Sequence, residues 1–149
     1  MKVATGSDHA GYELKEYVKH ILEEKGYTII DVGTDSEVSV DYSDFGFKVA
    51  RLVSEGSVDK GVLICGTGMG MSVVANKVRG IRASLCQDLY TAIQSRKHLD
   101  ANILVLGARV IGKGLAEEIV KTWFGTDFEG GRHQGRVEKI NAWEQEHLK

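Results

Sequence analysis

The sequence predicts a doubly wound, Rossmann-like α/β fold, in which a five-stranded parallel sheet is flanked by helices in three α/β/α layers. Three observations predict it. Short aliphatic or β-branched runs alternate with segments of helical periodicity along the 149 residues. The run from Lys60 to Cys65 is almost continuously apolar, as in strands that are buried on both faces of a parallel sheet. Glycine, present 18 times, marks the ends of elements, whereas proline is absent.

The first half of the chain predicts two strand–helix units. Residues 1–7 form a short strand, and residues 27–33 form a β-rich strand that ends at a glycine. A helix over 10–25 is indicated because apolar residues recur on one face with the 3.6-residue period: Leu14, Tyr17, Val18, Ile21 and Leu22. A second helix over 41–56 has the same pattern, with an inward face made of Phe45, Val49, Leu52 and Val53.

The second half continues the alternation. Strands are predicted over 60–65, 81–86 and 102–107. A helix follows each of these strands: one after the glycine loop through Lys77, one over 88–98 that opens with an aspartate, and one over 111–124. After a glycine-rich segment, a closing helix is expected over about 134–148, most plainly from Arg136 to Leu148. No repeat or domain boundary interrupts the chain, so residues 1–149 are expected to form a single domain.

Composition narrows the class of protein. The net charge of −2 gives no reason to expect attraction to nucleic acid or to a membrane surface. No run approaches the apolar length of a signal peptide or a membrane span. With two cysteines, a disulfide scaffold is not expected, and a reducing cytoplasm is the simplest location.

Polar residues gather in the turns that follow the predicted strands. These turns lie at residues 6–9, 33–44, 65–70, 86–88 and 107–109. In a parallel α/β sheet, ligands bind outside the carboxyl ends of the strands. The sequence therefore predicts a ligand site at this edge.

The glycine loop after Cys65 reads CGTGMGM. It is not the dinucleotide fingerprint G-x-G-x-x-G, because the third glycine would have to stand at Met71, and it lacks the G-K-[ST] of a nucleotide-phosphate loop. Bare amides before a helix nevertheless attract an anion, which is either a phosphate or an oxyanion formed during a reaction.

Two polar groups in this loop have alternative interpretations. Cys65 is either a thiolate favoured by the neighbouring amides or a small apolar residue that ends a buried strand. A redox role is disfavoured because no second cysteine lies nearby in the sequence. Thr67 either donates its hydroxyl to a substrate or bonds its own turn.

Other candidates lie in the remaining turns. Asp8 is a possible helix cap, and His9 beside it is less easily explained as one. His98 either complements a helix dipole or acts together with Asn102 around the next turn. Arg132 and Arg136, one helical turn apart, form either a phosphate clamp or a solvated patch. The five histidines show no metal-ligand spacing, so no metal is expected.

The chain resembles the ribose-5-phosphate isomerase B family of sugar-phosphate isomerases in four stretches: SDHAGYELK, CGTGMGMSVVANKVRGIRAS, HLDANILVLGARVIG and GRHQGRVEKI. The resemblance runs nearly end to end, with the motifs in the right order. It implies an aldose–ketose isomerase that needs no metal or cofactor and interconverts ribose 5-phosphate and ribulose 5-phosphate through an enediolate. Cys65 is then the base, Thr67 and His98 assist ring opening, and the enediolate oxygen rests on amides at the loop glycines: Gly66, Gly68 and Gly70.

The resemblance also implies six residues that hold the substrate: Asp8, His9, Asn102, Arg109, Arg132 and Arg136. Asp8 binds the sugar, Asn102 contacts the enediolate, and Arg109 supports the pocket. The phosphate is held by His9, Arg132 and Arg136. It further implies a homodimer or a dimer of dimers whose active sites are shared between subunits, with a contribution from the closing helix.

Two positions bear on how the family pattern applies to the site, and one of them departs from it. Some members replace the cysteine by a glutamate a few positions later, but the stretch MSVVANK has no carboxylate, so Cys65 is the candidate base here. Ser43 stands where a proline commonly follows the tyrosine, which leaves the turn at Tyr42 undetermined. The alternatives are a hexose-6-phosphate isomerase for allose or galactose 6-phosphate and, in a different class, a non-catalytic phosphate-binding module.

Overall fold

Five parallel strands form one sheet in the computed structural model, which describes residues 1–148. Their order across the sheet is β2–β1–β3–β5–β4. The strand bounds are β1 (Lys2–Ser7), β2 (Thr28–Asp31), β3 (Lys60–Cys65), β4 (Ala83–Leu85) and β5 (Ile103–Gly107). The predicted number of strands and their parallel direction are confirmed. All five strands therefore end on the same side of the sheet, which we call its carboxyl edge. The opposite side, where the strands begin, is the amino edge.

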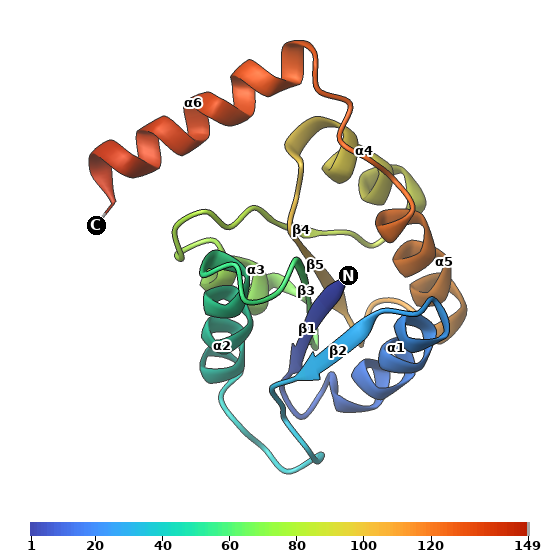
Figure 1. The fold of residues 1–149 in the computed structure, drawn as a ribbon. Coiled ribbons are helices and arrows are strands. Elements are labelled where there is room, and N and C mark those ends of the chain that lie inside the picture. Colours follow the sequence, from blue (N-terminus) through green and yellow to red (C-terminus); the bar gives the residue numbers. More distant parts are fainter. Residues whose placement is uncertain (149) are drawn as a thin grey trace.

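Helices cover both faces of the sheet, which confirms the three predicted layers (Figure 1). One face carries α1 (Tyr12–Glu24), α4 (Leu89–Leu99) and α5 (Lys113–Phe124), and the other carries α2 (Tyr42–Ser54) and α3 (Met69–Ala75). The last helix, α6 (Arg132–His147), lies outside both layers, and only its first turns approach α4 (Figure 1).

The central strand β3 divides its side chains between two cores. Val62 and Ile64 pack in the core under α1 and α5, whereas Leu63 and Cys65 pack in the core under α2 and α3. This alternation follows from the two-residue period of a strand. Because β3 is covered on both faces, its almost continuous apolar sequence is explained, and its last residue, Cys65, faces the α2 and α3 side.

Two element boundaries differ from the expectation. The strand expected over 81–86 is only three residues long, since β4 is an edge strand that pairs with β5 alone. The closing helix begins at Arg132 rather than near residue 134, directly after two glycines with positive φ, Gly130 and Gly131. Both predicted phosphate-binding arginines therefore lie within the first two turns of α6. Among residues 1–148, no helix has the length and apolar character needed to cross a membrane.

An ion network around the buried Lys15 joins α1 to the end of β2. The Lys15 side chain is 1% exposed, and its Nζ lies 2.6 Å from Asp31 Oδ2. Lys19 Nζ lies 2.8 Å from the same oxygen, and Asp31 Oδ1 accepts a hydrogen bond from the Gly33 amide at 3.0 Å. Gly33 in turn accepts a hydrogen bond from the Ser7 amide. The network thus supports the end of β1, from which Asp8 and His9 follow.

Acid should weaken the fold through Asp31. Burial raises the pKa of Asp31, but the hydrogen bonds from Lys15, Lys19 and Gly33 outweigh burial and hold the pKa below its usual value. A carboxyl group with a lowered folded-state pKa stabilises the fold above its unfolded pKa of about 4, and that stabilisation is lost as the pH falls through the folded pKa. The melting temperature of the unmodified protein should therefore fall on acidification, and that of Asp31→Asn should fall less steeply. Melting curves between pH 7 and pH 3 measure this.

Asp35→Asn is the matched control, because Asp35 is exposed and makes no ion pair among the described residues. This variant should follow the unmodified protein across the range. Parallel melting profiles for the unmodified protein and Asp31→Asn would contradict the role of the network.

Candidate active site

The loop after β3 places a thiol beside unpaired backbone amides. Cys65, 5% exposed, ends the strand, and α3 begins four residues later at Met69. Within residues 1–148, the amides of Gly66, Gly68 and Gly70 donate no hydrogen bond to the rest of the protein. Preorganised amides of this kind stabilise an oxyanion that forms beside them. The loop therefore joins a candidate base and a candidate oxyanion hole.

Thr67 takes part in the turn of this loop. Its Oγ1 accepts a hydrogen bond from the Met69 amide at 3.2 Å, and its carbonyl accepts one from Gln87 Nε2 at 3.2 Å. The local turn interpretation is therefore confirmed. The residue is exposed, and its hydroxyl hydrogen can still be donated to a substrate oxygen.

Three residues from neighbouring turns lie at the same edge. Asp8 is 7% exposed, and its Oδ1 accepts a hydrogen bond from the Gly11 amide at 3.1 Å, just before α1. His9 Nδ1 accepts from the Val40 amide at 3.2 Å, so Nε2 carries the proton of the neutral ring and can donate it. The Arg109 amide donates to the Gly66 carbonyl at 2.9 Å. We call Asp8, His9, residues 65–70 and Arg109 the carboxyl-edge group.

Tyr42 also belongs to this edge, and sequence reasoning did not select it. The residue begins α2, directly after its N-cap residue Asp41, so Ser43 is accommodated inside the helix without the family's proline. A Cβ added to Gly70 would lie 2.7 Å from Cε2 of the Tyr42 ring. The ring therefore lies against the glycine loop. The sequence shows no local signal for this contact, because the two residues come from different helices.

The other predicted site residues form a separate cluster where α4 ends and α6 begins. The ring of His98 stacks on His133 with centroids 4.1 Å apart, and Arg136 Nη1 lies 3.3 Å from His133 Nδ1. The buried position of His133 and the nearby charges of His98, Arg132 and Arg136 lower its pKa. We call these four residues the α4–α6 group. His133 was not selected from the sequence, although it lies between the two arginines in GRHQGR.

Three side chains of this region could approach one cation. Ligand atoms of His98, Glu129 and His133 all lie within 4.8 Å of one another. Spacing along the sequence could not reveal the cluster, because its members come from α4, the connecting segment and α6. Two features oppose metal binding. Arg132 and Arg136 add positive charge, and the hydrogen bond from Arg136 to Nδ1 leaves the proton of His133 on Nε2. The cluster suits an anion better than a metal ion.

The two groups lie at opposite edges of the sheet within one chain. Gly107 pairs with Cys65 at the carboxyl edge, whereas Ile103 pairs with Gly61 near the amino edge. Asn102 immediately precedes Ile103, and at about 3.3 Å per residue it lies roughly 17 Å along the sheet from Cys65. His98 ends α4 on the same side as Asn102.

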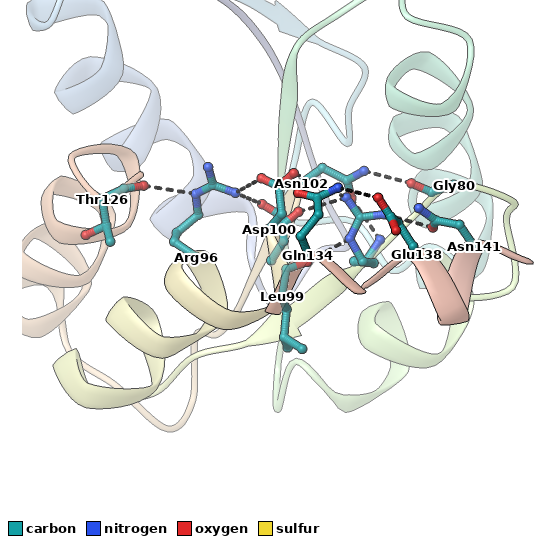
Figure 2. Close-up of polar contacts among 11 residues, drawn as sticks. Gly80, Arg96, Leu99, Asp100, Asn102, Thr126, Gln134, Glu138 and Asn141 are labelled. Atoms are coloured by element: carbon teal, nitrogen blue, oxygen red, sulfur yellow. Dashed lines mark hydrogen bonds and ion pairs between the residues drawn. The ribbon is translucent and has the colours of Figure 1, made fainter. Parts of the chain in front are cut away.

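Asn102 joins two segments of its own chain at the amino edge. Its Oδ1 accepts a hydrogen bond from the Arg82 amide at 2.8 Å, and its Nδ2 donates to the Gly80 carbonyl at 2.8 Å (Figure 2). Both ends of the side-chain amide are therefore used inside the chain. The expected contact of Asn102 with the enediolate stays a prediction.

The two cysteines have different surroundings. Cys86 is completely buried, its Sγ lies 3.6 Å from Ser95 Oγ, and burial raises its pKa. It has the position of an inert core thiol. Cys65, by contrast, ends its strand next to the unpaired amides, so it is the thiol that a ligand at the carboxyl edge can approach.

Comparison with known proteins decides the family. The model of the family described as Ribose/Galactose Isomerase matches residues 3–140. The chain belongs to this family. The isomerase is 50% identical to the ribose-5-phosphate isomerase B of Escherichia coli over 144 residues, which is 97% of each chain. The resemblance read from the four sequence stretches is thus confirmed.

Solved structures of related proteins share the whole fold of this isomerase. The ribose-5-phosphate isomerase B of Clostridium thermocellum superimposes with a TM-score of 0.96 at 53% identity and covers 99% of both chains. The Mycoplasma genitalium enzyme, solved with bound ribulose-5-phosphate, has a TM-score of 0.94 at 39% identity over 97% of both chains. The predicted fold class and the isomerase class are both confirmed.

Gly70→Ala should act through Tyr42. The added Cβ must push the exposed Tyr42 ring away from the glycine loop, so we expect kcat/KM of the isomerase to fall about tenfold or more while stability changes little. Steady-state kinetics and thermal melts measure both. In a Tyr42→Ala background the ring is gone, and Gly70→Ala should change kcat/KM by less than about twofold. An equal loss in both backgrounds would show that the Cβ acts on something other than Tyr42.

Proposed function

We propose that this isomerase interconverts D-ribose 5-phosphate and D-ribulose 5-phosphate, with Cys65 as the base. The observation that carries the proposal is the almost fully buried thiol beside three unpaired amides. The names of the Escherichia coli and Clostridium thermocellum relatives support the substrate, as does the ligand of the Mycoplasma genitalium enzyme. The reaction belongs to the non-oxidative branch of the pentose phosphate pathway.

The chemistry begins with the open-chain aldose. The Cys65 thiolate takes the proton from C2, and the electron pair moves through the new C1–C2 double bond onto the carbonyl oxygen O1, which gives an enediolate. The amides at the glycine loop stabilise this oxyanion. The Cys65 thiol then returns its proton to C1, while the hydroxyl proton on O2 passes to O1. The product carries its carbonyl group at C2.

The remaining residues of the carboxyl edge hold the sugar. Asp8 accepts hydrogen bonds from substrate hydroxyls, and Thr67 assists opening of the furanose ring. His9 presents its Nε2 proton to the phosphate. Arg109 lies over Gly66 and closes the pocket on that side.

We propose that each active site is completed by a second subunit. In a dimer, the α4–α6 group of one chain lies over the carboxyl-edge group of its partner. His98 then helps to open the sugar ring, and Arg132 and Arg136 clamp the phosphate with paired N–H donors. The separation of the two groups within one chain supports this arrangement, because neither group alone holds both the base and the phosphate clamp.

Exposed apolar side chains beside both groups also support a dimer. Met69 is 60% exposed and Val73 61% exposed near the glycine loop, while Trp143 is 57% exposed on α6. Clusters of exposed apolar residues mark protein interfaces. Helix α6, which lies outside the two helix layers, supplies part of the contact. The assembly is a homodimer or a dimer of dimers.

The proposed enzyme acts as a single domain over residues 1–149 in the cytoplasm, where its two free cysteines stay reduced. It takes a small sugar phosphate as substrate and needs neither a metal nor a cofactor, because proton transfer between two neighbouring carbons is within the reach of a thiolate and an oxyanion hole.

Cys65→Ala should remove turnover but retain substrate binding. We expect kcat to fall about 10³-fold, because a general base contributes roughly 10² to 10⁴ in rate. An isomerase assay on ribose 5-phosphate, allose 6-phosphate and galactose 6-phosphate measures turnover. Calorimetry with a linear sugar phosphate measures binding. Cys86→Ala, which removes the buried core thiol, is the control and should remain active.

Two results would overturn the proposal. Unchanged turnover in Cys65→Ala would remove the assigned base, and binding without turnover in the unmodified protein would favour a phosphate-binding module. A higher kcat/KM for allose 6-phosphate than for ribose 5-phosphate would assign the enzyme to the hexose phosphates instead.

A further inference from the structure

Arg82 joins three segments that meet at the amino edge of the sheet. Arg82 directly precedes β4, and its side chain is 17% exposed. Its Nε donates to the Leu99 carbonyl at 2.8 Å, and its Nη2 donates to the Asp100 carbonyl at 3.0 Å. Its Nη1 donates to Asn141 Oδ1 on α6 at 3.3 Å. One planar guanidinium therefore holds the end of α4 and the middle of α6 together.

The two elements that Arg82 joins carry the α4–α6 group. Leu99 and Asp100 directly follow His98, and Asn141 lies on the same helix as Arg132 and Arg136. A change in the Arg82 contacts would therefore change the position of His98 relative to the two arginines.

The end of α4 needs this support. Asp100 caps the helix in the left-handed conformation, with φ of 48°, which is uncommon for a residue other than glycine. The last carbonyls of a helix lack intrahelical donors, and Arg82 supplies donors for two of them. Arg96 holds Asp100 from the opposite side, since its Nη1 lies 3.0 Å from Asp100 Oδ1 while its Nε donates to the Thr126 carbonyl (Figure 2).

Few other contacts hold α6 to the body of the chain. Of its residues, only His133 and Val137 are buried. A cavity of about 480 Å³ lies between α6 and the segment around the outer strand β4. Its lining includes Arg82, Leu99 and Trp143. Beyond Arg82, the polar link on this side is the Gly80 amide, which donates to the Glu144 carboxylate at 3.0 Å. The buried His133 and Val137 hold the first turns of α6, which carry Arg132 and Arg136, whereas the polar contacts of Arg82 carry much of the connection of its middle.

We propose that Arg82 is a positioning residue for the isomerase reaction: it fixes His98 relative to the phosphate-binding arginines of the same chain. This proposal rests on the proposed function. The role requires arginine rather than lysine, because the planar guanidinium donates from three separate nitrogens to acceptors on two elements, whereas the three donors of a lysine ammonium all leave one nitrogen. Arg82 itself does not touch the substrate.

Arg82→Lys tests the proposal. It keeps the charge but loses the fork of donors, so His98 should shift while the arginines keep their place on α6. We expect kcat to fall about 10- to 100-fold, the range that misplacement by an ångström can cause. Inhibition by inorganic phosphate should stay within about twofold, because the phosphate clamp itself is kept. Arg51→Lys, whose exposed side chain pairs with Glu55 on α2, is the control and should behave like the unmodified protein.

A second background separates positioning from a general loss of structure. In His98→Asn, the group that Arg82 positions is gone, so adding Arg82→Lys should lower the residual kcat by less than about threefold. An equal loss in both backgrounds, or no loss in the unmodified one, would overturn the proposal. Parallel weakening of phosphate inhibition and kcat would also overturn it, because that pattern indicates a distorted α6.

The failure of this proposal is distinguishable from failure of the proposed function. An unmodified protein without isomerase activity contradicts the function itself, whereas an active protein whose Arg82→Lys variant matches it contradicts only the role of Arg82. Thermal melts show whether each variant is folded. Asn141→Ala removes only the α6 contact of Arg82 and should reproduce part of the loss in kcat, so it tests the same link in a milder variant.

Discussion

The close approach of neighbouring backbone segments to the end of β3 is the constraint on which the candidate site depends. A Cβ at Gly11 would lie 2.5 Å from the Ile64 carbonyl oxygen, and a Cβ at Gly107 would lie 2.6 Å from the Thr67 carbonyl oxygen. The start of α1 and the end of β5 can approach β3 this closely only because both residues are glycine. As a result Asp8, Cys65 and Arg109, which are far apart in the sequence, reach one edge. Their functional arrangement follows from main-chain packing before any side-chain contact is made.

The same topology separates the proposed phosphate-binding residues from the proposed base. The strands run parallel, so a helix that follows one strand returns to the opposite edge before the next strand begins. His98 lies at the end of such a helix, and α6 continues from that region. A chain of this topology gathers its proposed base and oxyanion hole at one edge and its proposed phosphate clamp at the other. A second copy of the chain, with its opposite edge turned toward the first, is the simplest way to bring the two together.

Much of this could be predicted from the sequence, because the relevant signals are local. The alternation of apolar strands with periodic helices predicted the sheet, and the glycine run after Cys65 marked the loop at its edge. The contacts of Asn102 could not be read in this way, since they depend on how β4 and β5 align at the amino edge. The place of Tyr42 against Gly70 and the stacking of His133 on His98 likewise depend on how helices pack, and no spacing along the chain encodes that packing.

The central claim is that the base and the ring-opening histidine of one active site belong to different chains. Cys65→Ala and His98→Asn homodimers should each be nearly inactive. After the two are mixed and their subunits exchanged, half of the dimers are heterodimers, and each contains one site with Cys65 from one chain and His98 from the other. The mixture should recover about a quarter of the unmodified activity. Exchange confirmed by mass spectrometry without any recovery of activity would show that both residues act within a single chain, and would contradict the account.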